Sequence, residues 1–275
     1  MEIKIIATDL DGTLLNEHSA LSEYTQAVFT AAAQKGIKIV VATGRPYGAL
    51  PACVKDFAYF DYAITSNGAA VYDMQNGTLL KSHTMRAESV RALSDYALLH
   101  AFGLEFVSGG KAYGEKYYFE HPEHFGFSRH SLEYLYSTRT KIEDLNAFLK
   151  EYAHSVESMH FVLKEERSKP KIIAHFCKDT SLYITSSHPL FAEFSSKECG
   201  KANALRFILE KEGLSQAQLA AFGNAQNDLE MIEMAQIGAV TADSAPEVLA
   251  RAAHRCAPCR QDGVAAFVEK EILNR

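Results

Sequence analysis

Two aspartates near the start of the chain, Asp9 and Asp11, are the residues whose types and spacing most directly suggest chemistry. They follow the apolar run Ile3-Lys4-Ile5-Ile6-Ala7, which is typical of a buried strand, and Gly12 after them allows a tight turn. Two carboxylates one residue apart can hold a hard cation and can present one oxygen as a nucleophile. In an open α/β sheet, ligands bind beyond the carboxyl ends of the strands, where this pair is predicted to lie. Because Asp-Gly is also common turn chemistry, the motif needs partners elsewhere in the chain.

Two further polar segments follow predicted buried strands. Thr43-Gly44 comes after the apolar run 37–42 and offers a hydroxyl and a backbone N–H, which are groups that hold phosphate oxygens. A threonine at this place is equally consistent with a helix cap. The segment 223–228 follows the apolar run 219–222, and its Asn224, Asn227 and Asp228 carry the oxygen donors that Mg²⁺ prefers. The sequence therefore predicts phosphate and cation chemistry at one edge of a sheet.

A lysine ahead of a late predicted helix, Lys201, could neutralise charge that develops on a transferring phosphoryl group. A lone lysine is usually a solvated surface residue, so this interpretation depends on the other sites. Lys197 competes with Lys201 for the role.

The composition is that of a globular protein with no polyanionic partner. The chain has 275 residues, 47% of them hydrophobic and 23% charged, and a net charge of −6. No cluster of basic residues predicts nucleic-acid binding, and no apolar run is long enough for a membrane span. The N-terminus reads directly into a strand and not as a signal peptide, so we expect a cytoplasmic protein.

Five cysteines are scattered along the chain and do not form a disulfide framework. Cys256-Ala-Pro-Cys259 is a CxxC without a second ligand pair nearby. A zinc site needs such a pair, and a redox motif would follow the first strand. We interpret this CxxC as coincidental.

Strand and helix patterns alternate at both ends of the chain but not in its middle. Strands are predicted at 3–8, 37–42, 62–65, 219–222 and 237–240, and helices at 22–34, 201–212, 228–235, 246–253 and 264–273, with a hairpin at 71–80. The middle is rich in Tyr, Phe and His, with helices predicted at 88–100 and 145–153 and strands at 111–119, 159–164, 171–176 and 182–185. These patterns predict an α/β protein: a Rossmann-like, doubly wound parallel-sheet core (1–82 and 188–275) with an inserted α+β domain (83–187).

In its motif order the chain resembles the haloacid dehalogenase (HAD) superfamily, and within it the Cof-type phosphatases with a C2B cap. The resemblance covers essentially the whole chain and rests on the following short segments: Asp9-Leu10-Asp11-Gly12-Thr13, Thr43-Gly44-Arg45, Asn67-Gly68-Ala69, Glu193 followed by Lys201-Ala202-Asn203-Ala204-Leu205, Asn227-Asp228 and Asp262-Gly263-Val264. The step from Glu193 and the following Ala-Asn-Ala-Leu favour Lys201 over Lys197 as the third-motif lysine.

The resemblance implies a Mg²⁺-dependent phosphoric monoester hydrolase that acts on a small phosphorylated metabolite, such as a sugar phosphate or a phosphorylated cofactor. Asp9 would form an aspartyl-phosphate, and Asp11 would be the acid and base. The implied catalytic residues are Asp9, Asp11, Thr43 and Lys201; the phosphate- or substrate-binding residues are Leu10, Gly12, Gly44, Arg45, Asn67 and Asn227; and the Mg²⁺ ligands are Asp9, Asp11, Asn224 and Asp228. The inserted domain would close over the site as a cap that selects the leaving group.

One residue departs from the family pattern. The fourth motif is usually Gly-Asp-x-x-Asn-Asp, and here Asn224 stands in place of its first acid. An amide removes one negative charge and should weaken Mg²⁺ binding. Three explanations stay open: a working phosphatase with weaker metal affinity, a catalytically impaired protein that binds a phosphorylated ligand, or an asparagine introduced artificially. We prefer the first, because the nucleophile, the acid/base and the lysine all remain.

The remaining expectations concern partners. We expect a monomer or weak homodimer that binds neither nucleic acid nor membranes. Phosphomutase activity is a further alternative within enzymes, since related folds return the phosphoryl group to a sugar. No residue of this sequence favours it.

Overall fold

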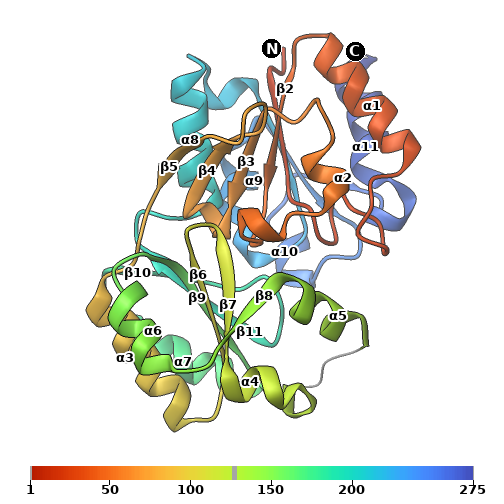
Figure 1. The fold of residues 1–275 in the computed structure, drawn as a ribbon. Helices are drawn as coiled ribbons and strands as arrows, with labels where there is room; N and C mark the ends of the chain where they lie inside the picture. Colours follow the sequence, from red (N-terminus) through yellow and green to blue (C-terminus); the bar gives the residue numbers. More distant parts are fainter. Residues whose placement is uncertain (1, 126–128, 275) are drawn as a thin grey trace. The chain divides into compact units, whose positions relative to one another are not determined.

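The computed structural model of the chain describes residues 2–125 and 129–274, and the chain divides into two compact units (Figure 1). The core unit comprises residues 1–44, 50–81 and 200–275, and the inserted unit comprises residues 45–49 and 82–199. The predicted insertion, 83–187, ends too early. Residues 188–199 belong to the inserted unit, because the strand Phe191–Ser196 pairs there and not in the core sheet.

The core unit is built on an eight-stranded sheet. Its strands, in spatial order, are β14 (His254–Cys256), β13 (Ile237–Thr241), β12 (Leu219–Gly223), β1 (Ile5–Thr8), β2 (Lys38–Ala42), β3 (Tyr62–Thr65), β4 (Ala70–Asp73) and β5 (Leu79–Ser82). The first six run parallel, and β4 turns back antiparallel to β3. Strands β1 and β12 are fully buried, which explains their nearly continuous apolar sequences.

Helices cover the core sheet. They are α1 (Glu23–Gln34), α2 (Ala52–Lys55), α8 (Lys201–Lys211), α9 (Leu229–Met234), α10 (Pro246–Leu249) and α11 (Gly263–Val268). Helices α8, α9 and α10 share one apolar cluster with β1, β2, β3, β12 and β13. Helix α1 packs beside α11 (Figure 1). The core is therefore a doubly wound α/β fold, as the sequence predicts.

The inserted unit contains a six-stranded sheet of its own. In spatial order its strands are β10 (Leu182–Thr185), β11 (Phe191–Ser196), β9 (Val156–Val162), β6 (Gly103–Ser108), β7 (Lys111–Glu115) and β8 (Arg139–Ile142). All neighbours pair antiparallel except β7 and β8. This is an α+β unit, as predicted.

Helices pack on both faces of this second sheet. They are α3 (Ala87–Leu99), α4 (Lys116–Glu120), α5 (Arg129–Thr138), α6 (Leu145–Tyr152) and α7 (Lys169–Phe176). Residues of α3, α6 and α7 join Met159 and Phe161 of β9 in one apolar cluster. Val162, the next residue of β9, packs instead with side chains of α4 and α5. Because successive side chains of a strand point to opposite faces, the two helix groups lie on opposite sides of β9.

One predicted strand of the inserted unit is wrong, and another is too long. Residues 171–176 belong to helix α7, which has a proline in its first turn and buries Ile172 and Phe176, four residues apart. The predicted strand 111–119 stops at Glu115, whose side chain accepts hydrogen bonds from the N–H groups of Tyr117 and Tyr118 and so begins helix α4. Across residues 2–125 and 129–274, no helix reaches the length and apolarity of a membrane span.

Candidate active site

Four neighbouring parallel strands of the core sheet deliver the predicted site residues. Strands β12, β1, β2 and β3 lie side by side, and the residues that directly follow them are Asn224, Asp9, Thr43 and Ser66. Backbone hydrogen bonds continue beyond the strands: Asp9 N–H donates to Phe222 O (2.9 Å), and Thr43 N–H donates to Ile64 O (2.8 Å). The same edge of the sheet therefore carries the first, second and fourth motifs, as the sequence predicts.

A buried charged triad forms the centre of the site. The Lys201 ammonium donates to Asp9 Oδ1 at 2.7 Å and to Asp228 Oδ1 at 2.6 Å. The side chains of Lys201 and Asp228 have no exposed surface, and that of Asp9 is 8% exposed. Lys201 is the first residue of α8, and it reaches both carboxylates from there. Such short, charge-assisted bonds fix the three side chains in one arrangement.

Burial and charge shift the titration of this triad. Burial raises the pKa of Asp9 to about 7; Lys201 opposes the rise, while the nearby Asp228 and Asp11 add to it. Burial alone would lower the pKa of Lys201, but Asp228 and Asp9 together raise it above its usual range. Lys201 is therefore a permanent cation, and its charge favours the ionised, nucleophilic form of Asp9.

Thr13 is a positioning residue whose role the sequence did not reveal. Its hydroxyl donates to Asp9 Oδ2 at 3.1 Å, and the residue is buried. The turn that brings it there is closed by Leu10 O, which accepts from the N–H groups of Thr13, Leu14 and Leu15. A hydroxyl four residues after the aspartate, across a glycine turn, is the signal that could have identified it. Asp9 thus receives a donor on each carboxylate oxygen.

Asn67 and Asn227 form an amide pair beside the second motif. Asn227 Nδ2 donates to Asn67 Oδ1 at 2.9 Å, and both side chains are buried. A β-carbon added at Gly44 would lie 3.3 Å from Asn67 Oδ1, so the amide pair adjoins the Thr43-Gly44 loop. Asn227 Oδ1 itself is buried without a hydrogen-bond partner. A buried polar atom of this kind commonly marks a site that binds a ligand or water.

A close backbone approach joins the Asn67 loop to the start of α8. Gly200 N–H donates to Asn67 O at 2.9 Å, and a β-carbon on Gly68 would lie 2.3 Å from Gly200 O. Ser66, Asn67 and Gly68 all have positive φ values, which are costly for the first two. Only glycine fits at position 68, and the contact sets where Lys201 begins its helix.

Asn224 lies against the turn of the first motif. A β-carbon added at Gly12 would be 2.3 Å from Asn224 Nδ2, so the glycine makes room for this side chain. Asp228 accepts from the N–H groups of Asn224 (2.9 Å) and Ala225 (3.0 Å) through Oδ2. Asp228 thus accepts from three protein donors and has no exposed surface, which favours its role in orienting Lys201 over direct metal binding. Asp11, by contrast, is exposed.

The oxygen donors at this edge of the sheet fit a Mg²⁺ ion with few protein ligands. Within residues 2–125 and 129–274, no three His, Cys, Asp or Glu side chains group as a ready metal site. Asp9, Asp11 and the amide of Asn224 nevertheless bring hard oxygen donors to adjacent strand ends. Mg²⁺ commonly uses one or two carboxylates and keeps several waters, so this set suffices chemically.

Three other predicted positions lie in the inserted unit or at the surface. Arg45 belongs to the inserted unit, where its guanidinium carbon lies 4.7 Å from the ring centre of Tyr134. Glu193 is buried in β11 and accepts from Ser187. Lys197 is exposed and forms a loose ion pair with Glu198 at 3.9 Å, which favours Lys201 as the lysine of the site.

The motif Asp262-Gly263 has a structural role. Asp262 Oδ1 accepts from the hydroxyls of Ser22 (2.6 Å) and Thr25 (3.0 Å) and so ties the start of α1 to the start of α11. Cys256 and Cys259 are free thiols, and burial raises the pKa of both, so neither is activated as a nucleophile.

A second buried ionic cluster lies within the inserted unit. Glu105 accepts from Arg139 Nη2 at 3.0 Å and from the Tyr118 hydroxyl at 2.8 Å, and His160 approaches at 3.7 Å. Burial alone would raise the pKa of Glu105, but Arg139 and His160 lower it below its usual range. This cluster stabilises the inserted unit as long as the carboxylate is ionised.

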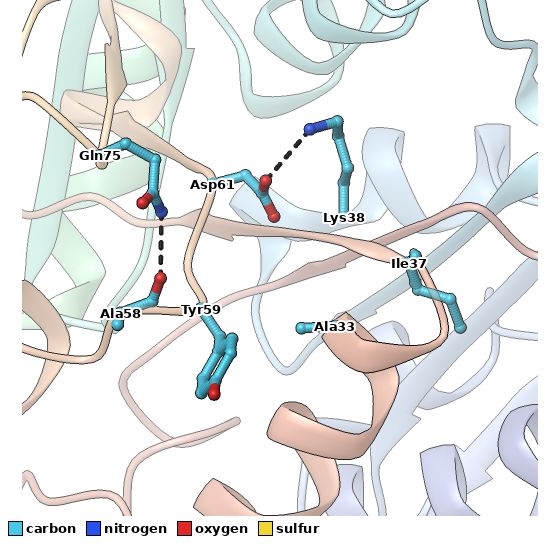
Figure 2. Close-up of a pocket in the computed structure, with 8 residues that line it drawn as sticks. Ala33, Ile37, Lys38, Ala58, Tyr59, Asp61 and Gln75 are labelled. Atoms are coloured by element: carbon cyan, nitrogen blue, oxygen red, sulfur yellow. Dashed lines mark hydrogen bonds and ion pairs between the residues drawn. The ribbon is translucent and has the colours of Figure 1, made fainter.

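A cavity of about 320 Å³ in the core unit contains none of the predicted site residues (Figure 2). Three of its polar lining side chains are already paired: Lys38 with Asp61 at 3.2 Å, and Gln75 Nε2 with Ala58 O at 3.1 Å (Figure 2). The chemistry therefore lies at the strand ends and not in this cavity.

Comparison with known proteins identifies the family. A model of the haloacid dehalogenase-like hydrolases matches residues 6–268. A putative phosphatase of Buchnera aphidicola subsp. Baizongia pistaciae is 31% identical over 245 residues, which cover 87% of this chain and 86% of the relative. The 5-amino-6-(5-phospho-D-ribitylamino)uracil phosphatase YcsE of Bacillus subtilis is 23% identical and covers 99% and 97% of the two chains.

Solved structures with the same fold agree. A haloacid dehalogenase-like hydrolase from B. subtilis superposes with a TM-score of 0.87 at 20% identity, over 98% of this chain and 100% of the other. The HAD subclass IIB sugar phosphatase BT4131 superposes with a TM-score of 0.80 at 22% identity, over 97% and 98%. The resemblance inferred from the motifs is thereby confirmed, and the chain belongs to the haloacid dehalogenase-like hydrolases.

Proposed function

We propose that this hydrolase is a Mg²⁺-dependent phosphatase that removes the phosphoryl group from a small metabolite through an aspartyl-phosphate on Asp9. The single observation that carries the proposal is the buried Lys201–Asp9 contact of 2.7 Å, with Asp228 on the other side of the ammonium. A carboxylate at a strand end, held by a permanent cation and by the Thr13 hydroxyl, is suited to act as a nucleophile.

The reaction has two balanced steps. In the first, a carboxylate oxygen of Asp9 forms a bond to phosphorus, the ester P–O bond breaks, and the leaving oxygen takes a proton from the Asp11 carboxylic acid. In the second, water attacks the same phosphorus and gives its proton to the Asp11 carboxylate, and the bond to Asp9 breaks to release phosphate. Asp11 is exposed and two residues from Asp9, so it can exchange protons with solvent.

The other residues at the strand ends stabilise charge on the phosphoryl group. Thr43, the Gly44 N–H, Lys201 and Asn227 would hold its oxygens, as the resemblance implies, and Leu10 and Gly12 shape the turn beside them. Bound Mg²⁺, held by Asp9, Asp11 and Asn224, would neutralise part of the phosphate charge and orient the group. Asp228 would keep Lys201 in place.

The proposed substrate class is supported by the substrates named for two relatives. YcsE acts on a phosphorylated ribitylaminouracil, and BT4131 is a sugar phosphatase. We extend to this chain only the property that these proteins share, a small phosphorylated metabolite as substrate. Arg45 follows β2 and Asn67 follows β3 in the sequence. Both are candidates for contacts to the part of the substrate that does not react.

The test is an assay of p-nitrophenyl phosphate and a panel of other phosphate esters, in which hydrolysis is measured as the phosphate released. Wild type should turn over at saturating Mg²⁺, and Asp9→Asn should abolish turnover, because an amide oxygen is a poor nucleophile. Trapping of a base-labile phosphoryl group on wild type but not on Asp9→Asn would support the intermediate. Undiminished turnover by Asp9→Asn would refute the proposal.

One observation favours a second candidate function. The neutral amide of Asn224 beside the Gly12 turn suits a protein that binds a phosphorylated ligand without hydrolysing it. If wild type shows no turnover at saturating Mg²⁺ while Asn224→Asp does, this second function replaces the first.

A further inference from the structure

We propose that Asn224 makes metal binding conditional: Mg²⁺ binds the protein alone only weakly, and it binds well together with a phosphate group. The inference rests on the proposed function, since it concerns the same residues. It goes beyond that function because it states an order and an energetic coupling between two ligands of the site.

The first step concerns the hydrogen-bond donors that already occupy the oxygens of the two buried acids. Asp9 receives Lys201 on Oδ1 and Thr13 on Oδ2, and Asp228 receives Lys201 on Oδ1 and two backbone N–H groups on Oδ2. Asp228 is fully buried, so a cation would have to displace protein donors to reach it. Of the two buried acids, Asp228 accepts from three donors and Asp9 from two, one on each oxygen, so Asp9 keeps a lone pair on both oxygens that a metal could share.

The second step concerns charge. When both buried carboxylates are ionised, they and the Lys201 ammonium sum to a net charge of −1. The side chain that lies nearest the Gly12 turn is the neutral Asn224. The exposed Asp11 adds one more negative charge. Cation affinity rises with the number of charged ligands, so we expect the protein without phosphate to bind Mg²⁺ weakly.

The third step concerns what a phosphate group adds. A phosphate dianion brings negative oxygens that both Lys201 and Mg²⁺ can share, and Mg²⁺ usually binds proteins through one or two carboxylates plus phosphate oxygens. Each ligand should then raise the affinity for the other by the same factor, because coupling between two binding sites is reciprocal. We expect this factor to be about 5- to 150-fold, the usual range of such couplings.

The experiment measures binding without turnover. Wild-type protein freed of metal with EDTA and then dialysed is titrated with Mg²⁺ in a calorimeter, in the absence and in the presence of inorganic phosphate. The melting temperature is recorded with Mg²⁺ alone, phosphate alone and both. We expect a weak Mg²⁺ isotherm alone, a clearly tighter one with phosphate, and a melting shift with both ligands that exceeds the sum of the separate shifts.

A variant tests the role of the amide itself. Asn224→Asp restores a carboxylate and should tighten Mg²⁺ binding in the absence of phosphate on the order of 10- to 100-fold. It should also lower the melting temperature of the metal-free protein, because it places a further carboxylate beside an acidic site. The matched control is Asn76→Asp in the exposed turn between β4 and β5, where Asn76 Oδ1 accepts from Thr78 N–H and an aspartate can do the same. The control adds the same charge and should leave Mg²⁺ binding unchanged.

Two results would overturn the inference: wild type that binds Mg²⁺ alone as tightly as Asn224→Asp, or Mg²⁺ and phosphate shifts that simply add. The wild-type coupling decides the matter even if Asn224→Asp does not fold. Because no step of these measurements requires turnover, a phosphatase without the coupling and a coupled binding protein without activity are distinguishable outcomes.

Discussion

Replacement of Lys201 should destabilise the core unit more than replacement of Asp228, and the two effects should not add. Lys201→Met leaves the buried Asp9 and Asp228 carboxylates without their cation. Removal of one partner from a buried pair typically costs about 3–5 kcal/mol. For a chain of this size about 2–4 °C is lost per kcal/mol, so the melting temperature should fall by about 6–20 °C.

Asp228→Asn has a smaller expected effect because Lys201 keeps Asp9 at 2.7 Å. The variant loses one charge-assisted hydrogen bond, worth about 1.5–3 kcal/mol. Its amide oxygen, in the place of Oδ2, can still accept from both backbone N–H groups. In the double variant the Lys201–Asp228 bond is lost only once. Its cost should therefore fall short of the sum by about 0.5–3 kcal/mol, the usual coupling of contacting residues.

The assay is differential scanning calorimetry of the four proteins in EDTA, so that no metal contributes. The matched control is the exposed pair Lys197–Glu198, which is 3.9 Å apart with both side chains 59% exposed. Lys197→Met and Glu198→Gln should each change stability by less than about 0.5 kcal/mol and should add. If the Lys201 and Asp228 effects add within about 0.5 kcal/mol, or if Asp228→Asn costs more than Lys201→Met, the triad is not the coupled unit that its geometry indicates.

Three further outcomes are expected. Gly12→Ala should lower both stability and turnover, because its added β-carbon would lie 2.3 Å from Asn224 Nδ2. The control is Gly36→Ala: Gly36 has the same φ of +77°, but no atom lies within 4 Å of its added β-carbon. The difference in melting temperature between the two variants therefore isolates the cost of the contact with Asn224. Thr13→Val should lower kcat while leaving KM nearly unchanged, because it removes a hydrogen bond to the nucleophile Asp9. Thr13→Ser keeps the hydroxyl and should retain most of the rate. Equal rates for the two variants would argue against a positioning role of Thr13. Because the pKa of Glu105 lies below its ordinary value of 4.5 in the folded protein, its stabilisation is complete above that pH and is lost as the pH falls toward the folded pKa. Acid unfolding followed by circular dichroism should therefore be less steep in Glu105→Gln, which should also be about 3–5 kcal/mol less stable at pH 7.

The strand ends of the core were predictable from the sequence because parallel strands covered on both faces have continuous apolar sequences. The runs before Asp9, Thr43 and Asn224 all show this pattern, and each ends in polar residues with a glycine nearby. Parallel strands that share a sheet end at one edge, so the approximate site followed from local sequence alone. The contacts of Lys201 did not, because they depend on where α8 begins relative to Asp9, 192 residues earlier, and to Asp228, 27 residues later.

The inserted unit was harder to predict, because its strands obtain their partners from distant sequence. Strand β11 alternates buried apolar residues with Glu193 and Ser195, and its place beside β9 is visible only once both strands are paired. Helix α7 was mistaken for a strand because two isoleucines in a short apolar run suit either structure. Pro170 in its first turn was the local signal that should have favoured a helix.

The short segment 45–49 sets the boundaries for any exchange of the inserted unit between relatives. Gly48 N–H donates to Gly110 O at 2.8 Å, and Arg45 stacks on Tyr134, so this segment packs with a unit that the chain enters again only at residue 82. A chimera that replaces only residues 82–199 would leave these five residues facing foreign partners. The inserted unit is therefore discontinuous in sequence, and an exchange must replace residues 45–49 and 82–199 together. Gly200 should be kept, because it connects the inserted unit to Lys201 at the start of α8.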